Sequence, residues 1–142
     1  MTVKAILDQK GRDVFTVGPD ITVADAGKEL SKQRIGAVVV VDAGNRIRGI
    51  VSERDIVRAV ADKGPSVLNE AVSTVMTENV SVCHEEDTVN QLMEMMTRGR
   101  FRHVPVETDG KLGGMVSIGD VVRMRIEQVE REAEEMKAYI AS

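Results

Sequence analysis

The chain has 142 residues, of which 42% are hydrophobic and 30% charged, and its formal net charge is −4. This is the composition of an ordinary globular domain, and the acidic excess argues against bulk binding of nucleic acid, which needs a positive surface. The longest apolar run covers only residues 37–41, so we expect no membrane-spanning segment. The single cysteine, Cys83, excludes a disulfide framework, and with no apolar signal-peptide core near the start it predicts a cytoplasmic protein.

The first half of the chain is predicted to alternate strands and helices. Residues 35–41 are a β-branched run without polar alternation, which is typical of a strand buried on both faces. Ser52 is well placed to cap a helix. The elements expected are, in order, a strand at 13–17, a helix that begins after Asp20 or Thr22, strands at 35–41 and 46–52, and a helix at 53–61.

The second half repeats the first. The sequence Gly-Ile-Val-Ser-Glu-Arg-Asp-Ile-Val-Arg at 49–58 returns as Gly-Met-Val-Ser-Ile-Gly-Asp-Val-Val-Arg at 114–123, an offset of 65. The elements expected are a strand at 80–83, a helix at 88–98, strands at 101–107 and 111–117, and a helix from 118, with short helices near 3–7 and 68–76 ahead of each copy. The prediction is an α/β (α+β) fold of two β-α-β-β-α repeats related by pseudo-twofold symmetry, with repeats at 1–65 and 66–125 and a helical extension at 126–142.

The last helix is predicted to run on to about Tyr139. Its apolar residues are spaced 4, 3, 4, 3 and 4 apart, which is a heptad seam: Val122, Ile126, Val129, Ala133, Met136 and Ile140. Such a seam favours a homodimer, and the alternative is a helix that folds back on its own domain.

Both copies carry a Ser followed three residues later by an Asp, Ser52 with Asp55 and Ser117 with Asp120. An Asp one turn into a helix can accept hydrogen bonds from the vicinal hydroxyls of a ribose, and a helix N-terminus attracts phosphate. The alternative is a capping box that binds no ligand. Because both copies keep the pair, we favour ligand binding.

These motifs resemble a pair of cystathionine-β-synthase (CBS) domains in its stand-alone bacterial form, over about residues 3–123. The resemblance rests on the repeated Gly-Ile-Val-Ser-Glu-Arg-Asp segment and on the Gly-Ala-Val-Val-Val-Val-Asp strand at 36–42. It implies a regulatory module for signal transduction and energy sensing. The module is expected to bind AMP, ADP, ATP or, in some members, NAD(H) or S-adenosylmethionine in a cleft between the repeats, and to dimerise into a disc.

The resemblance also implies which residues surround the ligand. Adenine contacts fall on Gly36, Ala37, Val38, His103 and Val104, and further contacts on Thr16 and Ser81. Ser52, Asp55, Ser117 and Asp120 are expected at the ribose and phosphate. Arg54, which has Gly119 as its counterpart, and Arg102 and His103 are expected at phosphate, as are Lys10 and Arg12; the alternative for each is a solvated surface.

Other functions find less support in the sequence. The pair Cys83 and His84 lacks further ligands, so we expect a structural role and no metal. No catalytic triad, Walker loop or dinucleotide fingerprint is present, and we predict no enzymatic activity. The basic group Arg98, Arg100, Arg102 and His103 leaves an anion site open despite the negative net charge. The alternative to nucleotide sensing is an interaction or dimerisation protein with unoccupied pockets.

Overall fold

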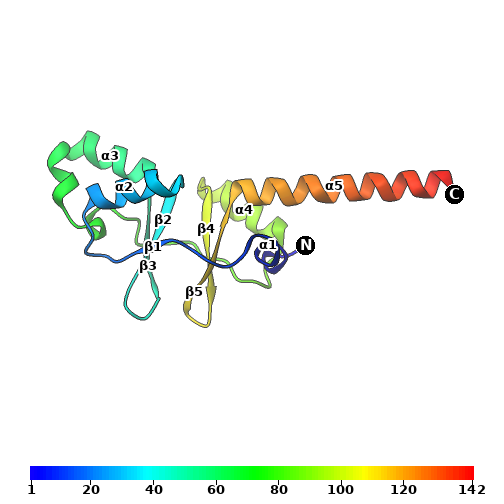
Figure 1. Ribbon diagram of the computed structural model, residues 1–142, viewed down its shortest axis with the longest axis horizontal. Helices are drawn as coiled ribbons and strands as arrows, with labels where there is room; N and C mark the ends of the chain where they lie inside the picture. Colours follow the sequence, from blue (N-terminus) through cyan, green and yellow to red (C-terminus); the bar gives the residue numbers. More distant parts are fainter.

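A computed structural model describes all 142 residues and shows two α/β halves side by side, with one long helix projecting from the second half (Figure 1). The first half contains β1 (Thr16–Val17), α2 (Val23–Gln33), β2 (Ala37–Val41), β3 (Ile47–Ser52) and α3 (Glu53–Lys63). The second contains α4 (Val89–Gly99), β4 (His103–Thr108), β5 (Lys111–Ser117) and α5 (Ile118–Ala141). The α1 helix (Val3–Lys10) comes first, and two short 3-10 helices, η1 (Pro65–Asn69) and η2 (Val72–Thr74), link the halves. The expected fold class is confirmed.

The two small sheets are similar but not identical. In the first half, β1 pairs in parallel with β2, which pairs antiparallel with β3; in the second half, β4 and β5 form an antiparallel pair. The strand expected at 80–83 is wrong, because only Cys83 makes a bridge, with Val106. Its N–H donates to the Pro105 carbonyl at 3.0 Å, and its carbonyl accepts from the Glu107 N–H at 2.9 Å. The next bond of a parallel ladder needs an N–H on residue 105, and proline has none.

The helices begin where the polar residues predict. Thr22, and not Asp20, caps α2, with its side chain accepting from the Asp25 N–H. Ser52 caps α3 and Ser117 caps α5, and each forms a reciprocal capping box with the Asp three residues later. The local sequence therefore determines where α3 and α5 begin.

The segment in front of each repeat packs on the other repeat. From α1, Val3, Ile6 and Leu7 are buried in the core of the second half, whereas Val72 of the linker is buried in the core of the first half. The helix expected at 68–76 is replaced by η1 and η2, because Ala71 between them is extended and pairs with Thr22. The chain thus crosses between the halves twice, and this joins them into one body.

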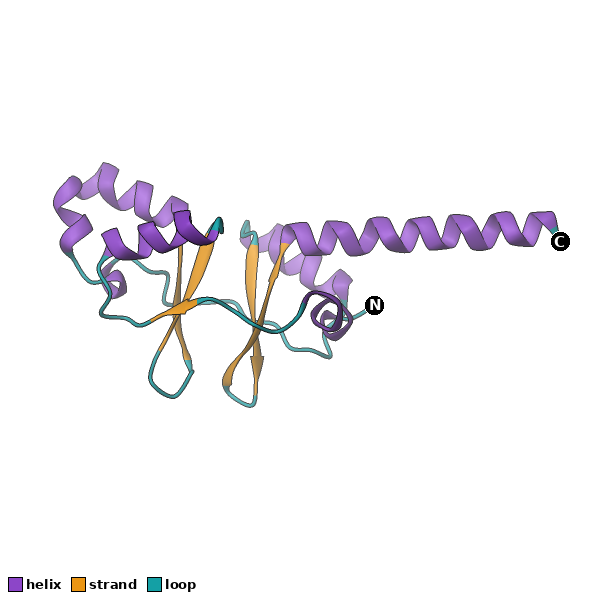
Figure 2. Ribbon diagram, viewed as in Figure 1, coloured by secondary structure: helices purple, strands orange, loops and turns teal.

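The α5 helix leaves the second half and extends away from the molecule, as Figure 2 shows. The alternative in which this helix folds back on its own domain is wrong. Five residues of the heptad seam are between 49% and 76% exposed: Val122, Ile126, Val129, Met136 and Ile140. None of the helices combines the length and the apolar composition needed to cross a bilayer.

Candidate nucleotide site

A cavity of about 540 Å³ lies between the two halves, on the side of α3. Its walls come from both repeats: the start of β2, the end of β3 and the start of α3 from the first, and the segment 99–103 from the second. Residues 77–81 of the linker complete them, and Thr77 bridges to Ile50 of β3. The halves meet beside it, because a Cβ atom on Gly36 would lie 3.5 Å from Cε1 of His103. A second junction holds the far ends of the sheets, where the Leu112 N–H donates to the Asn45 carbonyl at 3.0 Å. The two halves are therefore joined at both ends of their sheets.

The carboxylate of Asp55 has one engaged and one unengaged oxygen. Its Oδ2 accepts from the Ser52 N–H at 2.8 Å and from the Ser52 hydroxyl at 3.0 Å. These are the bonds of the capping box, so the structural role considered from the sequence is present. Oδ1 accepts no hydrogen bond from the protein. Asp55 lines the cavity, and its carboxylate keeps the capacity to accept a hydroxyl donor.

Four arginines line the same cavity: Arg54 and Arg58 from α3, and Arg100 and Arg102 from the segment before β4. No ion pair of the chain involves any of them. Against them stand the carboxylates of Glu53 and Asp55, which leaves a surplus of two positive charges. In a chain with a net charge of −4, this concentration of guanidinium groups suits a phosphorylated ligand.

His103, the first residue of β4, also lines this cavity. Burial, followed by the positive charges of Lys10 and Arg102, holds the pKa of His103 below its ordinary value, against an opposing effect of Asp120. The imidazole is therefore neutral near pH 7 and offers one donor and one acceptor. A phosphate nearby would favour its protonated form.

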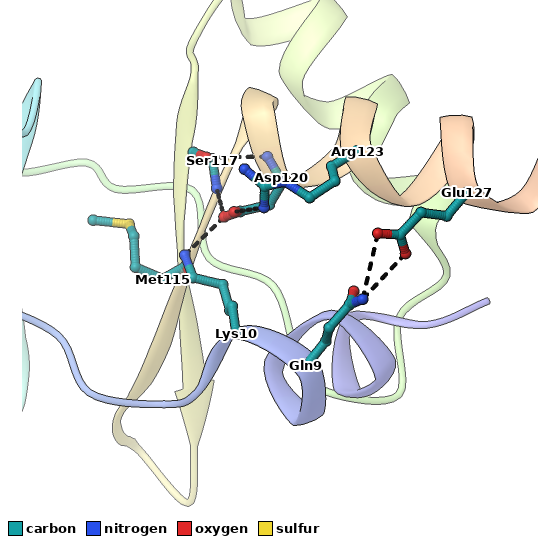
Figure 3. A network of polar contacts seen from close by, with 7 residues as sticks. All are labelled: Gln9, Lys10, Met115, Ser117, Asp120, Arg123 and Glu127. Carbon is teal, nitrogen blue, oxygen red and sulfur yellow. Dashed lines mark hydrogen bonds and ion pairs between the residues drawn. The ribbon is translucent and has the colours of Figure 1, made fainter.

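The equivalent carboxylate in the second half, Asp120, is fully engaged (Figure 3). It is only 7% exposed. Its Oδ2 accepts from the Ser117 N–H at 2.8 Å and from Lys10 Nζ at 2.7 Å, and Oδ1 accepts from Arg123 Nη1 at 3.3 Å. Burial raises the pKa of Asp120, but the hydrogen bonds from Lys10 and Ser117 outweigh it, so the pKa lies below its ordinary value. Each oxygen of the Asp120 carboxylate therefore already has a cationic side chain of the protein as its partner.

The repeated architecture is also the architecture of a known family. A family model for the CBS domain matches residues 3–62 and 72–127. The chain belongs to the CBS-domain family. This confirms the resemblance seen in the sequence.

Individual relatives agree with this assignment. A CBS-domain containing protein from Agrobacterium tumefaciens is 54% identical, with a TM-score of 0.85 over 88% of this chain and 99% of its own. The CBS domain pair of protein MJ0100, solved with 5′-methylthioadenosine and S-adenosyl-L-methionine, is 27% identical, with a TM-score of 0.80 over 90% of this chain and 98% of its own. A mitochondrial CBS domain-containing protein of Arabidopsis thaliana is 35% identical over 98% of this chain and 71% of its own length.

Within this CBS pair, eight residues expected from the sequence line the cavity together: Gly36, Ala37, Ser52, Arg54, Asp55, Ser81, Arg102 and His103. The remaining ones do not line it. Val38 and Val104 are buried in the two cores, Thr16 lies in β1, and Ser117 and Asp120 lie at the start of α5 in the second half of the molecule. The role of each in binding stays a prediction.

The two basic residues expected at phosphate from the N-terminal segment are paired with carboxylates instead. Lys10 binds Asp120, and Arg12 Nη2 lies 2.6 Å from Glu85 and 2.7 Å from Asp8. The two hydrogen bonds, to Asp8 and then to Glu85, raise the pKa of Arg12. Neither residue lines the cavity.

Arg100, named from the sequence as part of a basic group that could form an anion site, lines the cavity, whereas sequence reasoning missed other lining residues, among them Arg58, Thr77 and Asn79. Arg58 follows Asp55 by one helical turn, a spacing that could have identified it. Thr77 and Asn79 reach the cavity only because the linker crosses to the first half, and no local pattern predicts that crossing.

The pair Cys83 and His84 is not part of the site. Burial raises the pKa of the Cys83 thiol to about 12, and the thiol lies inside the second core. His84 lies 3.8 Å from both Asp87 and Glu107. No group of three or more His, Cys, Asp or Glu side chains is arranged to hold a metal ion.

Proposed function

We propose that this CBS-domain pair is a regulatory module that binds an adenosine nucleotide in the cavity between its repeats. The observation that carries the proposal is the combination, around one cavity, of a carboxylate with an unengaged oxygen and four arginines without ion-pair partners. A carboxylate binds ribose hydroxyls, and guanidinium groups bind phosphate. AMP, ADP, ATP and NAD(H) present both groups, and we propose a ligand from this set.

The relatives support the adenosine part of the proposal. The CBS pair of MJ0100 was solved with two adenosine compounds, and its backbone matches this chain over 90% of the residues. The cavity of about 540 Å³ is of the size that small-molecule sites have. We assign no catalytic residue, and we propose that the module acts by changing an interaction when nucleotide binds. A cytoplasmic location stays a prediction from the single cysteine.

Isothermal titration calorimetry tests the proposal directly. AMP, ADP, ATP and NADH are titrated into the chain, and each titration is repeated with Arg54→Ala. We expect at least one ligand to bind at micromolar or lower Kd and the variant to bind it more weakly. Absence of binding for all four ligands would favour the alternative, an interaction protein with unoccupied pockets. Incubation with the same ligands and chromatography of the products tests for turnover, and we expect none.

We also propose that two chains associate through α5. The exposed apolar seam supports this, because a projecting helix cannot bury such a stripe on its own domain. Sedimentation of the intact chain at micromolar concentration tests this part, and a monomer would contradict it.

A further inference from the structure

The two halves of the cleft differ most at the carboxylates that the repeat makes equivalent. Asp55 has an oxygen with no protein partner, whereas both oxygens of Asp120 are covered, one by Lys10 and one by Arg123. Arg123 has Arg58 as its counterpart at the offset of 65, but Arg58 makes no ion pair with Asp55 and lines the cavity. Lys10 is thus one of two cations that reach only the second carboxylate.

Lys10 occupies a position that backbone occupies in the other half. Its Nζ also donates to the Met115 carbonyl at 2.9 Å. The counterpart of Met115 is Ile50, whose carbonyl accepts from the Thr77 N–H at 2.9 Å. In the second half the ammonium of Lys10 therefore takes the place of a backbone N–H as donor to this carbonyl. The same ammonium also donates to the carboxylate of Asp120.

The lysine is held there by a packed helix. It is the last residue of α1, whose Val3, Ile6 and Leu7 are buried in the second core. Gln9, the preceding residue, binds Glu127 of α5 at 3.1 Å (Figure 3). The end of α1 is therefore held against α5 by the Gln9 contact next to the ion pair between Lys10 and Asp120.

We propose that Lys10 closes the Asp120 half of the cleft by taking the place of a ligand, so that each chain binds one nucleotide, at Asp55. This rests on the proposed nucleotide-binding function. A ribose at Asp120 would have to displace a charge-assisted hydrogen bond, which weakens affinity roughly ten- to hundredfold. Removing the ammonium frees one acceptor position on Oδ2, although Ser117 stays on Oδ2 and Arg123 on Oδ1, and we expect this position to take a ribose hydroxyl of a second nucleotide.

Calorimetry with AMP and with ATP tests the closure through stoichiometry. We expect one nucleotide per wild-type chain, no change in Asp120→Asn, and binding weakened by about 10- to 150-fold in Asp55→Asn. Lys10→Met should bind a second nucleotide, and adding Asp120→Asn to Lys10→Met should remove it. Lys4→Met is the matched control, because Lys4 lies on the same helix but pairs with Asp8, and its stoichiometry should stay at one.

The outcomes separate the closure from the function on which it rests. Two nucleotides per wild-type chain, with one lost in Asp120→Asn, would overturn the closure and leave the proposed function intact. Weaker binding in Lys10→Met at unchanged stoichiometry would also overturn it and make Lys10 a phosphate ligand. A wild-type chain that binds none of AMP, ADP, ATP and NADH refutes the proposed function, and the closure then stands only if Lys10→Met gains a site.

A second inference comes independently from the charges that flank the seam of α5. At about 100° per residue, the seam lies on the helix face opposite Met124, which is buried in the second core. A partner helix can therefore pack on the seam without contacting the module from which α5 projects. In heptad terms Ile126 and Ala133 are a positions and Val122, Val129 and Met136 are d positions.

The flanking charges distinguish between two orientations of the partner. In a parallel pair each g residue faces the e residue five positions on, which places Arg125 against Glu130 and Glu132 against Lys137 of the partner subunit. In an antiparallel pair over the same seam, Glu130 faces Glu130 and Glu132 faces Glu132. The first arrangement is attractive throughout, and the second brings like charges together.

We infer that the partner on α5 is a second copy of this chain in parallel orientation, with both cavities at the same end of the dimer. This deepens the proposed homodimer. Arg125→Glu or Glu130→Arg alone should weaken the dimer by roughly five- to thirtyfold, because each replaces two attractive pairs with repulsive ones. The double variant should restore wild-type affinity. Arg131→Glu is the control, since this residue has the same charge but an f position away from the seam.

Sedimentation measures these affinities, and cross-linking fixes the orientation. In a parallel dimer Val129→Cys faces its own copy and should form a disulfide on oxidation. In an antiparallel dimer it faces residue 133, so cross-linking only in a mixture of Val129→Cys and Ala133→Cys chains would overturn the inference. A wild-type monomer would refute the proposed homodimer itself.

Discussion

The carboxylate of Asp55 allows the strength of the nucleotide contact to be worked out before it is measured. Two of its acceptor positions, both on Oδ2, are taken by Ser52, and Oδ1 is unengaged. One ribose hydroxyl can therefore bind strongly, and a charge-assisted bond of this kind contributes about 1.5–3 kcal/mol. In Asp55→Asn the amide oxygen can still accept from the Ser52 N–H, which keeps the helix cap and presents an NH₂ group in place of the free oxygen. We expect Kd for AMP or ATP to rise by about 10- to 150-fold.

Calorimetry with two ligands separates this contact from a general loss of structure. The natural nucleotide is compared with its 2′,3′-dideoxy analogue, which keeps adenine and phosphate but lacks both hydroxyls. Asp55→Asn should weaken the natural nucleotide and leave the analogue nearly unchanged, while unfolding in urea confirms that the variant is folded. An equal loss for both ligands would show that Asp55 acts through the helix cap and not through ribose.

Three further expectations follow from the packing and the charges. Arg54→Ala should weaken AMP by calorimetry much more than adenosine, because only AMP has a group for the guanidinium; equal losses would place Arg54 outside the phosphate contact. Leu7→Ala should lower the free energy of unfolding in urea by about 2–5 kcal/mol, because Leu7 is fully buried in the second core, and a much smaller loss would contradict that packing. Lys10→Met should cost about 1–3 kcal/mol near pH 7. The pKa of Asp120 is lowered overall, although its burial acts in the opposite direction, so this stabilisation is present above the ordinary value of 3.8 and is lost as pH falls through the lowered pKa. Urea unfolding of wild type and variant at a series of pH values should show their difference shrink below that point.

The sequence predicted the local structure of the repeats well, because that structure depends on short-range patterns. The strand Ala37–Val41 falls within the expected 35–41 and both Ser caps are as expected, since β-branched runs and N-cap residues act within a few positions. The opening strand of the second repeat failed for a reason that was also visible in the sequence. Pro105 lacks the N–H that the ladder needs. This could be used only once it was known that the segment ending at Cys83 pairs with β4, which contains Pro105.

The boundary of the second repeat was harder to place. From the sequence, the helical extension is expected to begin at residue 126. Met124, just before this boundary, is buried in the second core, and Glu127, just beyond it, binds Gln9 of α1. One face of the early part of α5 therefore packs in the second core, and the opposite face carries the first residues of the seam. A truncation meant to test the dimer has to begin after Gln128.

The inequivalence of the two halves was expected from the sequence, but in a different place. The repeats differ at the positions of Arg54 and His103, and both of these residues line the same cavity. The larger difference lies before the repeats, where α1 and the linker cross over. Leu7 and Met76 are equivalent, because a Cβ on Gly114 would lie 2.9 Å from Leu7 Cδ2 and one on Gly49 2.6 Å from the Met76 sulfur.

Val17 comes ten positions after Leu7, whereas Cys83 comes only seven positions after Met76. The longer segment lets α1 continue for a further turn, and that turn carries Lys10 to Asp120. The shorter segment instead brings the Thr77 N–H to the Ile50 carbonyl, and Thr77 and Asn79 line the Asp55 cavity. A difference of three residues outside the repeated motif therefore decides whether the capping oxygen of the Asp receives a lysine in addition to its Ser. An alignment of the two motifs alone cannot show this, because the Ser and Asp of both copies are the same.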